Sequence, residues 1–303
     1  MLYLQHFGLR EPPFRITPDT AFFYPGTSPQ QALNTLLVAL SAGEGSIKVT
    51  GEVGTGKTLL CRKLLAGLGP NWICAYIPNP DLPPRSLLLT LADEFGVKPG
   101  TDLDDHRLTR EINRALLQLA REGKRALVCL DEAQAMSVES LETLRLLTNL
   151  ETEKRKLLQV VLFGQPELDE KLAQDRIRQL RQRITFQHQL TLFDKNDLQH
   201  YLEHRLTVAG RIGSPVFSNA GVDLLYRASA GTPRLINILA NKAMMLAFGE
   251  GAQRVSRSHM KAAIADTPAS VAKSAPRSLQ GLFWLALLGG LAYAVLMIQR
   301  LGT

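Results

Sequence analysis

The stretch SIKVTGEVGTGKTLL, residues 46–60, decides the fold class of this chain. Residues 47–50 are typical of a short buried strand, and the segment from Lys57 onward carries leucines at helical spacing. Between them, residues 51–58 fit G-x-x-x-x-G-K-[ST] in the strand, loop and helix context that a phosphate-binding loop requires. This pattern predicts an α/β nucleotide-binding core.

The chemistry of the loop explains its residue types. Glycines let backbone N–H groups converge on phosphate oxygens, and the N-terminus of the following helix adds its partial positive charge. We expect Lys57 to reach the β and γ phosphates of ATP and Thr58 to hold Mg²⁺. The predicted nucleotide-binding residues are Gly51, Glu52, Val53, Gly54, Thr55, Gly56, Lys57, Thr58 and Leu59.

A second buried strand, residues 126–130, ends in two adjacent carboxylates. Asp131 at the strand end is suited to hold Mg²⁺, and Glu132 is suited to orient and deprotonate the attacking water. Two acids are needed because the metal occupies one of them. Together with the phosphate loop, the pair predicts hydrolysis as well as binding.

Further downstream, polar and basic residues stand at the ends of predicted elements. A third apolar strand, residues 157–163, stops before Gln165, which would lie beside the γ-phosphate if this strand sits between the other two. The segment RIRQLRQRITF is rich in arginine, and the sequence GTP places Arg234 in the first turn of a helix. Arginine suits a developing phosphoryl charge because its donors are fixed in a fork.

The order of these parts resembles the AAA+ ATPases. Within that superfamily, four stretches of the sequence are similar to the ExeA/GspA group of secretion and pilus ATPases. They are GEVGTGKTLLCRKLL, LDEAQAMSVESLETLRLLTNLETEKRKLLQVVLFGQPELDEKL, RQLRQRITF and GTPRLINI. Inside that group the chain most resembles the branch that serves the mannose-sensitive haemagglutinin (MSHA) pilus. The likeness extends over residues 1–266 and includes the opening YLQHFGLREPPFRITPD.

The resemblance implies a role for each matching residue. Gln165 corresponds to sensor one, although Asn, Ser or Thr is more usual there, and Arg234 corresponds to sensor two. The position just before the next strand makes Arg183 the first candidate for an arginine finger, with Arg181 and Arg178 in reserve. The implied catalytic set is Lys57, Glu132, Gln165, Arg183, Arg181 and Arg234, acting on ATP with Mg²⁺ held at Thr58 and Asp131. A ring or dimer of identical subunits is also implied.

The resemblance also implies the domain organisation. Residues 1–193 would form the AAA+ core, a parallel sheet flanked by helices, and residues 194–266 an all-helical lid that closes over the nucleotide. A linker rich in Pro, Ser and Ala, residues 267–280, would follow. The last expected element is a transmembrane helix over residues 281–299.

The membrane prediction rests on the residues themselves. The 18 residues from 281 to 298 carry no charge, which is about the lower limit for a helix crossing a hydrocarbon layer roughly 30 Å thick. Lys273 and Arg277 precede the apolar run and Arg300 follows it, so the slight basic excess lies on its N-terminal side. This asymmetry predicts that the residues before the span face the cytoplasm, and the resemblance implies that the membrane is the bacterial inner membrane.

Composition narrows the function only slightly. The net charge of +7 among 303 residues suits nucleic acid, an anionic membrane or an acidic partner, and the three scattered cysteines suggest neither disulfides nor zinc. Two classes remain open, beside a third and lesser one, a nucleotide-gated scaffold that does not hydrolyse ATP. One is an ATPase that supports assembly of a type IV, MSHA-like pilus or a type II secretion apparatus, with assembly proteins as partners. The other is a DNA-dependent ATPase of the transposition or replication type, which the predicted membrane helix disfavours.

Overall fold

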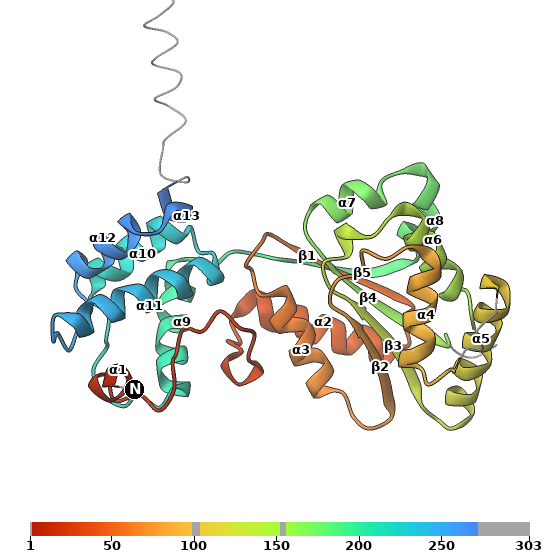
Figure 1. Cartoon of the computed structure of the whole chain (residues 1–303), viewed down its shortest axis with the longest axis horizontal. Helices are drawn as coiled ribbons and strands as arrows, with labels where there is room; N and C mark the ends of the chain where they lie inside the picture. Colours follow the sequence, from red (N-terminus) through yellow and green to blue (C-terminus); the bar gives the residue numbers. More distant parts are fainter. Residues whose placement is uncertain (1, 99–103, 152–155, 272–303) are drawn as a thin grey trace, which may run out of the picture.

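The computed structural model of the chain describes residues 2–98, 104–151 and 156–271. Figure 1 shows two groups of elements, a sheet covered by helices and a separate cluster of helices beside which the N-terminus lies. The predicted transmembrane segment, residues 281–299, lies outside the described residues, as does most of the linker before it. Within the described ranges, no helix combines the length and the apolar character needed to cross a membrane.

The strands are β1 (Ser46–Gly51), β2 (Trp72–Ile77), β3 (Arg125–Leu130), β4 (Leu158–Gly164) and β5 (Ile184–Leu190). The helices of the sheet group are α2 (Thr27–Ala42), α3 (Lys57–Gly67), α4 (Pro84–Glu94), α5 (Asp105–Arg121), η2 (Ala133–Ala135), α6 (Val138–Leu147), α7 (Glu167–Leu172), η3 (Asp175–Ile177) and α8 (Arg178–Arg183). The remaining helices are α1 (Leu2–His6), η1 (Thr20–Phe22), α9 (Lys195–Val208), α10 (Asn219–Ser229), α11 (Pro233–Gly249), α12 (Arg257–Ala265) and α13 (Pro268–Val271).

The sheet has the order β2-β3-β4-β1-β5, and every neighbouring pair of strands is parallel. The expected α/β core with a parallel sheet is therefore confirmed. Strand β4 lies between β1 and β3, which is the condition that the prediction for Gln165 required. Because parallel strands end at the same edge, the residues after β1, β3 and β4 meet there.

Both faces of the sheet are buried, so its central strands are apolar almost throughout rather than alternating with polar residues. Val128 and Val160 face a core shared with α4, α5 and α6, whereas Leu127 and Val161 face a core shared with α2 and α3. Cys61 and Cys129 lie in this second core as free, buried thiols.

The second group of helices includes residues from the start of the chain. Phe7, Leu9, Phe14 and Phe22 are buried in one core with apolar residues of α9 to α12. These residues fall within the predicted core domain, residues 1–193, whereas their side chains pack with helices of the predicted lid. This opening segment is rich in aromatic residues, and these side chains become buried in the same core as the apolar residues of the helices.

Candidate functional site

The phosphate loop connects β1 to α3 and turns sharply at Gly54, whose φ is +82°. A Cβ at Gly54 would lie 2.8 Å from the Cβ of Arg234, so a side chain fits neither the conformation nor the space. Lys57 is buried, and its Nζ donates to the carbonyl oxygens of Gly51 at 2.7 Å and Glu52 at 3.2 Å. Burial lowers the pKa of Lys57, while the nearby carboxylates of Glu132 and Asp131 act in the opposite direction.

The end of β3 brings a carboxylate against the start of α3. Oγ1 of Thr58 donates to Oδ2 of Asp131 at 2.6 Å, and the hydroxyl of Tyr76 on β2 lies 3.5 Å from the same oxygen. Asp131 is 2% exposed, and this burial raises the pKa of its carboxyl group. Tyr76 is not among the predicted site residues, because nothing in the sequence of β2 indicates that this strand lies beside β3.

The next residue, Glu132, adopts a left-handed backbone conformation with φ of +55°. Non-glycine residues rarely do so, and such strain is concentrated at functional sites. Its Oε2 accepts hydrogen bonds from the side-chain amides of Gln134 at 2.5 Å and Gln165 at 3.1 Å. Burial alone would raise the pKa of Glu132, but these two hydrogen bonds and the charge of Lys57 lower it on balance.

Gln165 follows β4 at the edge where the phosphate loop and the Asp131–Glu132 pair meet. Besides its contact with Glu132, its backbone N–H donates to Oε1 of Gln134 at 3.0 Å. Gln134 thus bridges the ends of β3 and β4, and Lys171 holds its turn by donating to the carbonyls of Gln134 and Met136. Gln134 stands three residues after Asp131 in the LDEAQ stretch, so its position was the available signal for a role here.

The predicted lid reaches the phosphate loop through the start of α11. The backbone N–H of Arg234 donates to the carbonyl oxygen of Gly54 at 3.1 Å. A cavity of about 330 Å³ lies between the two groups of elements at this contact. It is lined by Val53, Gly54, Gly56, Lys57, Thr58 and Leu59 of the loop and α3, by Glu132, by Tyr201, Arg205, Pro233, Arg234 and Asn237 of the helices, and by residues 15–19.

The wall formed by residues 15–19 was not foreseen as part of the site. It is held by arginines from both groups of elements. Arg205 on α9 is 4% exposed and donates to the carbonyls of Pro13 at 2.5 Å and Arg15 at 3.3 Å, while its guanidinium lies 4.5 Å from the ring centre of Phe22. Arg62 on α3 donates to the carbonyl of Pro18 at 3.2 Å. Such backbone contacts leave no pattern in the sequence.

The candidate finger arginines lie apart from this cavity, on α8 before β5. Arg183 is half-buried and one of its terminal nitrogens lies 3.3 Å from Oγ1 of Thr148, to which it donates. Arg178 and Arg181 are exposed. None of the three contacts the phosphate loop of its own chain, so their assignment stays a prediction.

The residues at the edge of the sheet fit a magnesium nucleotide. A hydroxyl and a carboxylate oxygen, at Thr58 and Asp131, stand 2.6 Å apart and are oxygen donors of the kind that Mg²⁺ prefers. The ammonium of Lys57 and the backbone of the loop supply positive charge and N–H donors beside them. The set is therefore chemically suited to a nucleotide with its metal.

Comparisons with known proteins agree with this chemistry. Residues 40–172 match the AAA domain family. Over 254 residues, 84% of this chain, the sequence is 44% identical to the general secretion pathway protein A of Aeromonas hydrophila. The chain spans 46% of the length of that relative.

Solved structures share the fold at low identity. The Aeropyrum pernix ORC1 protein in complex with DNA has a TM-score of 0.59 at 20% identity, over 83% of this chain and 68% of that one. The ORC2 protein of the same organism has a TM-score of 0.56 at 19% identity, over 82% and 72%. The Thermotoga maritima RuvB branch migration motor has a TM-score of 0.53 at 15% identity, over 78% and 67%. These likenesses show the α/β fold of a P-loop protein and no specific activity.

Residues 40–172, which contain the P-loop and most of the parallel sheet, therefore match the AAA domain family, and the chain is similar to general secretion pathway protein A over 254 aligned residues.

Proposed function

We propose that this chain binds and hydrolyses ATP. The observation that carries the proposal is the meeting of Lys57, the Thr58–Asp131 pair and the Glu132–Gln165 pair at the carboxyl edge of the sheet. Lys57 faces the β and γ phosphates, and Thr58 and Asp131 hold Mg²⁺, which neutralises phosphate charge when bound. Glu132 takes the proton of the attacking water, and Gln165 orients that water and the carboxylate.

Arginines complete the proposed machinery. Arg234, whose backbone already contacts the loop, reports the state of the nucleotide to the helices as sensor two. Arg183, with Arg181 and Arg178 in reserve, reaches the phosphate of a neighbouring subunit in a homo-oligomeric ring or dimer. No residue of α8 lines the cavity of its own chain, which supports action on a neighbour rather than within the chain.

We further propose that the ATPase supports the assembly of a type II secretion apparatus or an MSHA-like type IV pilus at the bacterial inner membrane. The 44% identity to general secretion pathway protein A supports the secretion role. The pilus role, and the kinship with the MSHA pilus biogenesis protein MshM, rest on the sequence resemblance. Assembly proteins of the inner membrane are the proposed partners, and residues 281–299 are the proposed anchor, with the ATPase domain in the cytoplasm.

The experiment measures ATP binding and turnover by the full chain in detergent and in lipid vesicles, with and without duplex DNA. Lys57→Ala should lose nucleotide binding, because it removes the ammonium that faces the phosphates. Glu132→Gln should bind ATP and fail to cleave it, because Asp131 remains. Lys63→Ala, on the same helix and outside the cavity, is the control and should behave as the unsubstituted chain.

Two outcomes would contradict the proposal. Turnover by Glu132→Gln at the unsubstituted rate would remove Glu132 from the role of base. Stimulation by DNA, without any response to lipid, would favour the DNA-dependent alternative over membrane-linked assembly.

A further inference from the structure

A basic face of α5 lies at the end of the molecule remote from the helical group (Figure 1). The opposite side of this helix buries Leu108, Ile112 and Leu116 against the sheet. Arg107, Arg114 and Arg121 recur every seven residues and therefore line the outward side, about 10.5 Å apart along the axis. The helix is held in place by its apolar side, and its basic side faces away from the core.

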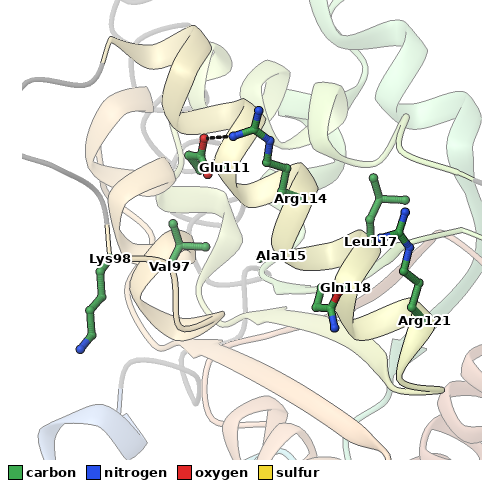
Figure 2. A pocket seen from close by; sticks show the side chains of 8 residues that line it. All are labelled: Val97, Lys98, Glu111, Arg114, Ala115, Leu117, Gln118 and Arg121. Atoms are coloured by element: carbon green, nitrogen blue, oxygen red, sulfur yellow. Dashed lines mark hydrogen bonds and ion pairs between the residues drawn. The ribbon is translucent and has the colours of Figure 1, made fainter.

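An open depression of about 700 Å³ lies along this face, and Figure 2 shows the side chains that line it. They are Glu111, Arg114, Ala115, Leu117, Gln118 and Arg121 of α5, with Val97 and Lys98 from the turn after α4. Leu117 is 38% exposed and gives this face an apolar contact area. The surface thus combines apolar contact area with a basic rim.

The positive charge of this face is only partly balanced by the chain itself. Arg114 pairs with Glu111 at 2.6 Å, and Arg107 lies 3.9 Å from Asp104. Within the described ranges, Lys98 and Arg121 have no carboxylate partner within 4.0 Å. A partner that brings carboxylates to this face would therefore meet unneutralised cations.

We propose that the face formed by Arg107, Arg114, Leu117 and Arg121, with Lys98 beside it, docks an amphipathic acidic helix of a partner protein. The seven-residue spacing of the arginines matches the spacing at which a second helix, packed alongside, presents equivalent side chains. Carboxylates at that spacing meet the arginines, and an apolar residue between them covers Leu117. This proposal does not depend on the proposed ATP chemistry, since no residue of the face lines the nucleotide cavity.

Other occupants fit the surface less well. A second copy of the same face would place arginines against arginines, which is repulsive. Single-stranded nucleic acid is bound on aromatic side chains, and none of the described residues that line the depression is aromatic. A flat lipid surface would leave a hollow of this size unfilled.

The test uses the full chain and a synthetic helical peptide of about three heptads, with Glu at every seventh position and Leu between. A peptide of the same composition in scrambled order is its control. Fluorescence anisotropy of each labelled peptide is recorded at low and moderate salt. The ordered peptide should bind about tenfold more tightly than the scrambled one, the difference expected from aligning several exposed ion pairs and one apolar contact.

Substitutions then localise the binding. The triple variant Arg107→Glu, Arg114→Glu and Arg121→Glu should no longer bind the ordered peptide. It should instead bind a version of the peptide in which Lys replaces each Glu. The matched triple variant Arg227→Glu, Arg257→Glu and Lys261→Glu, at exposed positions of the helical group, has the same change in net charge and should bind as the unsubstituted chain. Leu117→Ser should weaken the binding of the ordered peptide severalfold. Circular dichroism and thermal unfolding of each variant verify that it is folded.

Several results would overturn the proposal. Equal affinity for ordered and scrambled peptides would mean that charge alone attracts them. An equal loss in the matched triple variant would place binding elsewhere. Tighter binding of a short DNA duplex or of anionic vesicles than of the peptide, lost in the Arg107, Arg114 and Arg121 variant, would assign the face to phosphate groups instead of carboxylates.

Discussion

Oγ1 of Thr58 lies 2.6 Å from Oδ2 of Asp131, although the two residues are 73 positions apart in the sequence. Thr58 follows the loop after β1 and Asp131 follows β3, and strand β4 lies between these two strands. The hydrogen bond therefore joins segments whose strands are not neighbours in the sheet. The hydroxyl and the carboxylate are the proposed holders of Mg²⁺, and each fixes the orientation of the other.

This pairing predicts how Thr58 variants respond to magnesium. Thr58→Ala removes one oxygen ligand and the hydrogen bond that orients Asp131, so the Mg²⁺ concentration for half-maximal ATP turnover should rise about tenfold or more. Thr58→Ser keeps the hydroxyl and should stay near the original value. A titration of turnover against Mg²⁺ measures the difference, and identical curves for the Ala and Ser variants would exclude a role for the hydroxyl.

The hydrogen bond from the Gln165 amide to Glu132 predicts that a substitution of Gln165 slows ATP turnover without weakening ATP binding. Gln165→Ala should lower kcat by about tenfold to a hundredfold, because the carboxylate and its water lose a positioning donor, while the Kd for ATP changes little. Gln199→Ala, at an exposed position on α9, is the control. A parallel loss of ATP affinity in Gln165→Ala would instead assign Gln165 to ground-state binding.

The position of α8 predicts that a substitution of Arg183 slows ATP turnover and that a second variant can restore part of the activity. Arg183→Ala should bind ATP normally and turn it over about a thousandfold more slowly, because its charge acts on a neighbour's phosphate. Adding the Lys57→Ala protein should restore part of the activity, since each subunit supplies what the other lacks. If Arg183→Ala keeps its activity and Arg181→Ala loses it, the finger is the exposed Arg181, and Arg183 serves only the contact with Thr148.

The close contact between Gly231 and Phe193 predicts that the helical group is sensitive to a single added methyl group at this point. Its φ is +75°, and a Cβ would lie 2.0 Å from the carbonyl oxygen of Phe193. Gly231→Ala should lower the free energy of unfolding by about 3 kcal/mol or more, because the backbone must move. Gly249→Ala, where an added Cβ meets nothing within 4 Å, should instead raise it by about 0.4–1 kcal/mol. Thermal unfolding of both variants measures whether the free energy of unfolding changes in these opposite directions.

The tail predicted from the sequence has a separate test. Removal of residues 281–303 should release the protein from washed membranes and leave its Kd for ATP unchanged, while full turnover requires a higher protein concentration. An anchor confines subunits to two dimensions and so raises their effective concentration. Ala286, Gly290 and Ala294 recur every four residues, so Gly290→Leu should keep the protein in the membrane and remove any association through the tail. A truncated protein that stays in membranes would contradict the assignment.

The sequence alone determined the parts of the site that are continuous in the chain. The phosphate loop needs glycines, a lysine and a threonine in one short stretch, and Asp131 and Glu132 end a strand that is apolar because both sheet faces are buried. These requirements are local, so they leave a pattern that can be recognised without the fold. The prediction for Gln165 required β4 to lie between β1 and β3, and the sheet has this order.

Only the tertiary structure decided which distant residues surround that core. The packing of Phe7 and Phe14 with the helical group, the wall of residues 15–19, and the buried Arg205 that holds it depend on contacts between segments nearly 200 residues apart. Arg205 bonds to backbone carbonyls, which every residue carries, so its partners impose no residue type that the sequence could reveal. Tyr76 reaches Asp131 because folding places the ends of β2 and β3 side by side, and Gln134 meets the backbone of Gln165 because β3 and β4 are neighbours.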